Sequence, residues 1–184
     1  MIGWVAAGAG ITFGLSLLML ALFFVRHDAR FDRVAEWSFV AFALMAIPTI
    51  VSVAGLFPDT GLVIGVATVV AVVGVAVVGL GELGSTLSLV EFRRIGPLVT
   101  LGFLAFLGWI GTVSVITLGG GRLPASLGWL GLGSIVLGIL SVVWLVRLPG
   151  VTTGAKEPSP GQMAVFFVPM IGIVGWMIWL GFSL

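Results

Sequence analysis

Residues 62–81 read LVIGVATVVAVVGVAVVGLG and contain no charged side chain. Such a valine-rich stretch would suit a buried strand in a water-soluble protein. In a lipid bilayer an open sheet leaves backbone groups unpaired at high cost, whereas a helix pairs them internally. A helix needs about 20 apolar residues to cross a hydrocarbon core of about 30 Å. The stretch therefore predicts a membrane-spanning helix, and the sequence lacks the polar alternation that a transmembrane barrel would need.

The composition of the whole chain extends this prediction. Hydrophobic residues make up 60% of its 184 residues and charged residues only 8%, whereas soluble domains carry about 25% charged residues. This number of charges is too small to cover a water-facing surface. Most of the surface must therefore face lipid. The net charge is only +1 and no basic patch is interleaved with aromatic residues, so we expect no nucleic-acid partner.

Six apolar runs of spanning length follow one another, separated by charged residues or turn formers. They are residues 2–25, 34–57, 62–90, 97–118, 125–146 and 163–184. We therefore expect an all-α membrane protein with a single domain, a bundle of six transmembrane helices. The first run is predicted to be a retained helix rather than a signal peptide, because it is long and no basic residue precedes Arg26.

Basic residues are unevenly distributed over the connections between these runs. The second and fourth connections contain one basic residue, Arg122. The basic residues of the first, third and fifth connections are Arg26, Arg30, Arg33, Arg93, Arg94, Arg147 and Lys156. Because short cytoplasmic loops are enriched in basic residues, the odd connections are predicted to be cytoplasmic and both termini to lie outside. Most tryptophans then fall near an interface, among them Trp176 at the outer one, while Trp109 lies mid-membrane.

Glu82 is the one charged residue inside a run and away from its ends. A carboxyl group in the membrane is costly and is a functional candidate. The simpler interpretation places it at the inner interface, because the third run is longer than the bilayer core requires. A helical projection places Ser85 and Thr86 on the same side as Glu82, and Leu80 and Leu87 on the opposite arc. These three polar residues form the candidate intramembrane site, which is predicted to face other helices.

The predicted cytoplasmic side carries two further candidates. Its arginines either contact anionic lipid headgroups or only fix the topology; they are Arg26, Arg30, Arg33, Arg93, Arg94 and Arg147. Asp28, Asp32 and Glu36 are spaced by four residues. They either form one helical face that holds a cation or belong to a solvated turn. His27 is either a simple interfacial residue or a proton-handling group.

Small residues at helical spacing predict close helix packing. Ala6, Gly10 and Gly14 form such a series in the first run, and Ser134 and Gly138 form another in the fifth. Backbones can approach closely along these faces, so helix association is expected to use them.

No feature of the sequence predicts a cofactor or a catalytic residue. The chain has no cysteine and one histidine, which excludes disulfides, thiolate metal sites and paired imidazole ligands within the chain. Gly79–Gly84 matches the dinucleotide pattern G-x-G-x-x-G, but it lies inside an apolar run without the strand and the acid that nucleotide binding needs. Its glycines are assigned to helix packing.

Residues 123–132 read LPASLGWLGL, and the pattern continues to Gly138. This stretch resembles a recurring pattern of uncharacterised multi-helix membrane proteins of bacteria and archaea, in which Leu-Pro and Leu-Gly-Trp open a late helix. The resemblance covers a small part of the chain. It implies a multi-pass protein of a bacterial or archaeal plasma membrane and carries over no site residues.

Three function classes are compatible with these features. The first is an accessory component that acts through helix–helix association, as a homo-oligomer or in a larger membrane complex, and low polarity with abundant glycine favours it. The second is a small proton-coupled or solute transporter that uses Glu82. The third is a lipid-modifying enzyme, the least favoured because clustered acids and histidines are lacking.

Overall fold

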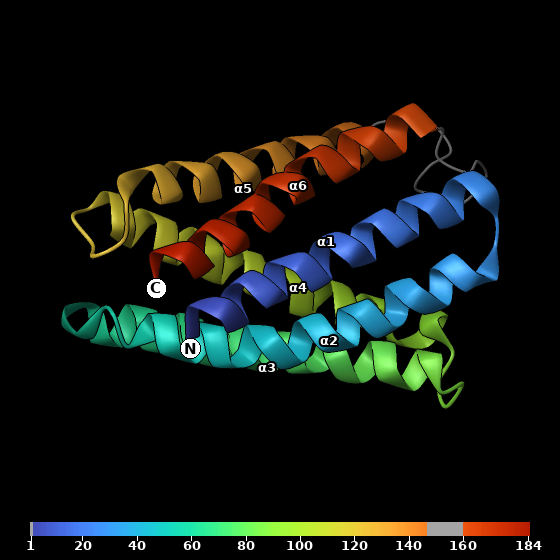
Figure 1. Cartoon of the computed structure of the whole chain (residues 1–184), viewed down its shortest axis with the longest axis horizontal. Coiled ribbons are helices and arrows are strands. Elements are labelled where there is room, and N and C mark those ends of the chain that lie inside the picture. Colours follow the sequence, from blue (N-terminus) through green and yellow to red (C-terminus); the bar gives the residue numbers. More distant parts are fainter. Residues whose placement is uncertain (1, 147–159) are drawn as a thin grey trace.

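The computed structural model describes residues 2–146 and 160–184, which form six α-helices (Figure 1). The predicted all-α class is confirmed. The helices are α1 (Ile2–Arg26), α2 (Ala29–Ala54), α3 (Gly61–Thr86), α4 (Phe92–Leu118), α5 (Ala125–Val146) and α6 (Pro160–Ser183), and a 3-10 turn, η1 (Pro58–Thr60), precedes α3.

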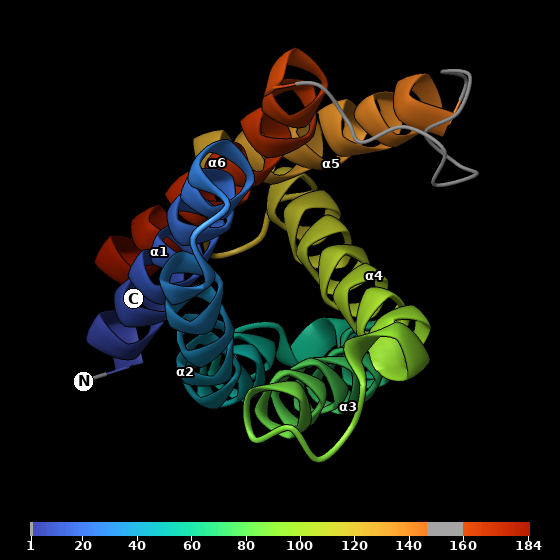
Figure 2. The same cartoon turned by 90° about the vertical axis from the view of Figure 1, so that its right-hand side faces the viewer.

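The six helices close into a ring. Each helix packs antiparallel against its neighbours in the sequence, and α6 packs against α1 to complete the circle (Figure 2). Gly3 near the start of α1 lies against Gly181 near the end of α6, so both termini are at the same end of the bundle. We call this the terminal end, and we call the opposite end, which holds the connections 27–28 and 87–91, the basic end.

Aromatic side chains fill the interior of this ring. Phe42 of α2 lies 5.0 Å from Phe13 of α1 and 5.4 Å from Phe106 of α4, measured between ring centroids. The series continues through Trp109 to Trp176 of α6, at 6.2 and 6.0 Å. Because α2 and α4 are not neighbours in the ring, side chains that join them must cross its middle. We call this series the aromatic column; it occupies the axis of the bundle.

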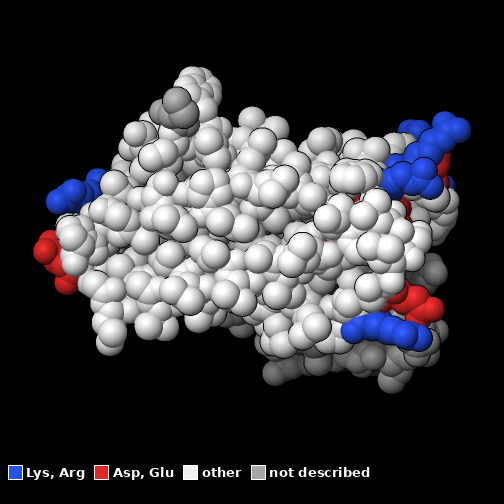
Figure 3. Space-filling view, turned by 90° about the horizontal axis from the view of Figure 1, so that it is seen from below, with Lys and Arg blue, Asp and Glu red and all other residues white. Residues whose placement is uncertain are grey.

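The face of the bundle seen in Figure 3 is apolar between two charged ends. Four segments are long and apolar enough to cross a membrane: Ile2–Arg26, Ala29–Ala54, Pro58–Thr86 and Arg94–Leu118. Among the described residues, α5 and α6 carry shorter apolar stretches, Ala125–Ser141 and Phe167–Ser183. The chain is therefore a multi-pass integral membrane protein.

Several helix ends differ from the apolar runs, and two of them show how polar groups continue or stop a helix. α2 begins at Ala29 rather than at residue 34, since the Asp28 carboxylate accepts a hydrogen bond of 2.9 Å from the Arg30 backbone N–H and caps the helix. α3 ends at Thr86 rather than at residue 90. Ser88 there adopts a φ of 56°, which a helix does not allow. Leu87 therefore lies in a turn rather than in the helix, so the predicted position of Leu87 on the helix arc opposite Glu82 is wrong.

The predicted small-residue series are used inside the chain. A Cβ atom added to Gly10 would lie 2.8 Å from the side chain of Ile178, and one added to Gly14 would lie 3.1 Å from Val174, so the first series packs on α6. In the second series, Ser134 of α5 packs against Gly172 of α6. The prediction of close helix packing is confirmed, and the partners lie within the same chain.

Candidate functional site

Glu82 lies on the inward face of α3, close to the basic end. Its side chain is 7% exposed, and it is the only charged residue among the described ones that is buried. Leu80, on the opposite arc of the helix, is 69% exposed. The helical projection therefore predicted the orientation of Glu82 correctly.

The glycines around Glu82 set the distance to the neighbouring helices. A Cβ atom on Gly79 would lie 2.7 Å from the Cβ atom of Ala43 in α2, and one on Gly81 would lie 2.6 Å from the side chain of Val99 in α4. This turn of α3 is therefore wedged between α2 and α4. The resemblance to a dinucleotide-binding pattern arises from helix packing, as expected.

The hydroxyl groups of Ser85 and Thr86, the other two residues of the candidate site, have different hydrogen-bond partners. The Ser85 hydroxyl group donates a hydrogen bond of 3.1 Å to Oε1 of Glu36 and so joins α3 to α2. The Thr86 hydroxyl group instead donates to the backbone carbonyl of Glu82 at 2.7 Å. Glu82 and Ser85 thus belong to one cluster with Glu36, while the Thr86 hydroxyl is taken up by its own helix.

Two acids of α2 complete this cluster. Asp32 and Glu36 lie one helical turn apart, and both interact electrostatically with Glu82. Their spacing in the sequence grouped them with Asp28, which instead caps α2. No group of three or more acids and histidines among the described residues is arranged to hold a metal ion. The cation site considered for Asp28, Asp32 and Glu36 is therefore not formed.

The Glu82 carboxyl group has no counter-charge from a described side chain. The one ion pair among the described residues joins Arg94 to Glu91 at 3.4 Å, and both side chains are exposed. No hydrogen bond from a described group reaches the Glu82 carboxyl group. Burying an uncompensated carboxylate is costly, so a buried carboxyl group must either carry a proton or lie beside a cation.

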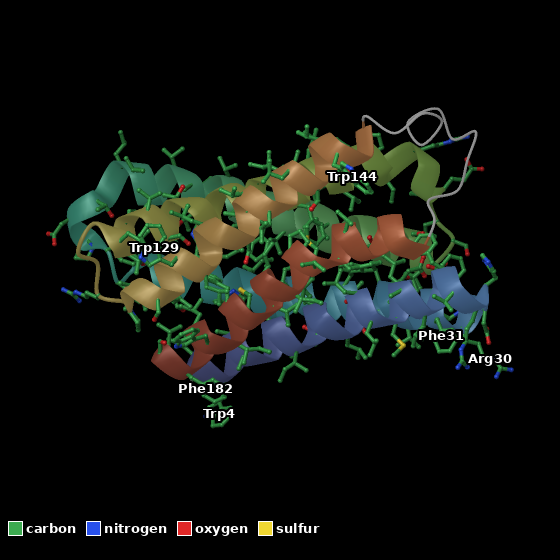
Figure 4. All side chains as sticks on the ribbon, turned by 90° about the horizontal axis from the view of Figure 1, so that it is seen from above. Trp4, Arg30, Phe31, Trp129, Trp144 and Phe182 are labelled. Carbon is green, nitrogen blue, oxygen red and sulfur yellow. The ribbon has the colours of Figure 1, made fainter. Side chains whose placement is uncertain are left out.

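The basic residues whose side chains are described at this end lie on the surface of the bundle. Arg26, Arg30, Arg33 and Arg94 are exposed there, and Figure 4 shows Arg30 pointing away from the helices. His27 is also exposed, in the turn between α1 and α2, where its φ is 53°. The side chain of Arg93, together with Arg147 and Lys156, lies outside what the structure describes.

A second group of buried polar atoms, in the terminal half of the bundle, was missed by the sequence analysis. The indole nitrogens of Trp109 and Trp176 and the hydroxyl groups of Ser114 and Thr117 have no hydrogen-bond partner among the described residues. Most other hydroxyl groups in these helices bond to the carbonyl four residues earlier, as Ser134 does to Leu130. Trp176, which the sequence predicted near the outer interface, is fully buried in the aromatic column, so its ring contacts other side chains rather than lipid.

Comparisons of the chain with protein-family models, with curated proteins and with solved structures find no match.

Proposed function

We propose that the chain is a small proton-coupled carrier of a bacterial or archaeal plasma membrane, in which Glu82 binds and releases the proton. One observation carries the proposal: the carboxyl group of Glu82 is buried in the helix bundle without a counter-charge from a described side chain. Ionisable groups inside membrane bundles are costly, and they mark proton relays and ion pathways.

The surroundings of Glu82 favour loading from the basic end. Asp32, Glu36 and Ser85 are half-buried and lie on the helix faces next to it. Carboxyl and hydroxyl groups can both accept and donate protons, so these side chains supply steps between water and Glu82. The orientation that we propose makes this end cytoplasmic, with six crossings and both termini outside.

The aromatic column separates Glu82 from the terminal end. Phe42 and Phe106 are in contact across the ring, and both are almost completely buried. A carrier with this arrangement must move helices to expose Glu82 to the other side, as alternating access requires. Pro48 in α2 and Pro169 in α6 interrupt the backbone hydrogen bonds of their helices and are the proposed bending points.

A second candidate is the accessory component that acts through helix association. The small-residue series on α1 and α5 are occupied within the chain, which removes the faces first considered for it. Gly61 and Gly65 of α3 are different, because nothing lies within 4 Å of a Cβ atom placed on either. They lie one turn apart, so a second helix could approach there, and the mass of the protein in mild detergent tests for a dimer.

The carrier proposal is tested by proton flux into proteoliposomes. A potassium gradient with valinomycin sets the membrane potential, and an enclosed pH-sensitive dye reports proton entry. We expect flux with the unchanged protein and none with Glu82→Gln, which keeps the size of the side chain but cannot bind a proton. Glu91→Gln is the matched control, because it makes the same change at an exposed carboxylate and should retain the flux.

A carrier that moves protons only with an unknown solute would give no flux alone, so proton binding is measured as well. Infrared spectra of the purified protein should show the carbonyl band of a protonated carboxyl group, and Glu82→Gln should remove it. If this band is unchanged in Glu82→Gln and the unchanged protein shows no flux, the proposal is wrong.

A further inference from the structure

A groove of about 710 Å³ lies between α1 and α2 on the outer surface of the ring. This volume falls within the range of about 300–1,000 Å³ that is usual for small-molecule sites. Leu15 belongs to the α1 wall of the groove. The α2 wall is formed by residues spaced three or four apart, which lie on one face of the helix. They include Arg30, Arg33, Val34, Trp37 and Ala41.

The two ends of the groove differ in chemistry. At the basic end, Arg30 and Arg33 belong to the lining of the groove, and neither is in an ion pair with a described residue. The Asp28 carboxylate caps the first turn of α2, so these side chains rather than the helix N-terminus supply the positive charge. A free pair of guanidinium groups matches the oxygens of a phosphate group.

Away from the arginines, the groove is lined by apolar atoms. It contains two hydroxyl groups, but both donate within their own helices. Ser38 bonds to the carbonyl of Val34 at 2.8 Å, and Thr12 bonds to the carbonyl of Gly8 at 3.0 Å. Neither hydroxyl group therefore has a proton left to donate to a solute, and apart from the indole N–H of Trp37 the remaining wall is apolar and suits a hydrocarbon chain.

The groove opens toward the bilayer. Leu15, Val34 and Trp37 are all exposed on the apolar surface between the two charged ends. Trp37 lies one turn beyond Arg33, and tryptophan is enriched at the level where lipid headgroups meet the hydrocarbon. A molecule with a phosphate group at one end and a long apolar chain at the other matches this order along the groove.

We propose that this groove binds one anionic phospholipid of the basic-end leaflet. Its phosphate group lies on Arg30 and Arg33, and one acyl chain lies along Leu15, Val34 and Ala41. The proposal narrows the arginine set considered from the sequence, because only these two arginines line the groove. It does not depend on proton transport.

Retention of lipid through purification tests the proposal. The protein is equilibrated in detergent with equal amounts of phosphatidylglycerol and phosphatidylcholine that have the same acyl chains, and the bound lipid is identified by native mass spectrometry. We expect phosphatidylglycerol to dominate, and Arg30→Gln with Arg33→Gln to lower its excess roughly tenfold.

The matched control removes the same charge elsewhere at this end. Arg26→Gln with Arg94→Gln should leave the excess of phosphatidylglycerol unchanged, since neither residue lines the groove. An equal loss in this control would show general attraction to the surface and would overturn the proposal. Each variant is first shown to elute and melt like the unchanged protein.

Two further measurements separate a lipid from a simple anion. Ala41→Leu narrows the apolar part of the groove without changing charge, so it should weaken retention while the arginines remain. Unchanged retention in this variant would contradict acyl-chain binding. Excess glycerol phosphate should not displace the lipid, and displacement would show that the site recognises the phosphate group alone.

Discussion

At the scale of the residue, Ser85 makes the one described side-chain contact that joins α3 to α2 by a hydrogen bond near Glu82. Ser85→Ala should lower stability by about 0.6–1.5 kcal/mol, because hydrogen bonds between membrane helices contribute modestly. Thermal unfolding in detergent measures this change. Thr100→Ala is the control, since this exposed hydroxyl bonds only to Gly96 of its own helix. Equal losses in both variants would show that the contact with Glu36 adds nothing.

The orientation of Glu82 was predictable and its partners were not. One helix fixes which residues share its face, so Leu80 and Glu82 could be assigned to opposite sides from the sequence alone. The contact with Glu36 depends on how α2 is rotated and how far it is shifted along α3, which no local pattern records. A signal was present in Asp32 and Glu36, which are spaced by one helical turn across the start of the second apolar run.

At the scale of the element, α3 and α4 approach each other closely at a pair of glycines. A Cβ atom on Gly74 would lie 2.7 Å from the carbonyl oxygen of Gly102, so only glycine fits at this crossing. Gly74→Val should force the helices apart and destabilise the bundle by about 1–3 kcal/mol, the usual range for overpacking. The fraction of folded protein after heating in detergent measures it.

Gly65→Val makes the same substitution on the same helix, where nothing lies within 4 Å of the added atom. It should be neutral or slightly stabilising in the monomer, because valine is tolerated on a lipid-facing helix surface. If both valine variants melted alike, the Gly74–Gly102 crossing would not be a tight contact in the membrane protein.

The helices themselves followed from the sequence better than their ends did. Apolar length alone separates the six elements, since backbone pairing in lipid leaves few alternatives to a helix. The ends depend on single polar groups, such as the Asp28 cap that starts α2 at Ala29 inside a charged segment. The Gly74–Gly102 contact was also missed, because glycine is so frequent in this chain that no spacing distinguishes the pair.

At the scale of the whole molecule, the ring explains why polar groups are found at different depths. The acids Asp32, Glu36 and Glu82 lie toward the basic end. The hydroxyl groups of Ser114 and Thr117, which have no partner in the described part of the chain, lie toward the terminal end. The aromatic column fills the space between them with packed rings from α1, α2, α4 and α6. Any transport by this fold therefore requires these rings to move, which makes helix motion part of the proposed mechanism.

The topology of the ring can be tested with three reporter fusions, because the side of one connection determines the side of the others. Neighbouring helices are antiparallel, so the connections before α3 and before α5 share the terminal end with both chain termini. The only charged residues in these two connections are Asp59 and Arg122, whereas the basic end carries most of the arginines, and basic residues are retained on the cytoplasmic side. Reporter fusions at Gly61 and Gly119 should therefore report an external position, and a fusion at Ser88 a cytoplasmic one.

Because every second connection must lie on the same side, the three fusions check one another. A control changes the distribution of basic residues. Moving basic residues into the connection at Gly119 should reduce the external signal of the fusion there, without changing the fold of the purified protein. A cytoplasmic signal at Gly61 with an external one at Ser88 would invert the bundle. It would place Glu82 and the arginine-lined groove at the external leaflet, and loading of the proton would then occur from outside the cell.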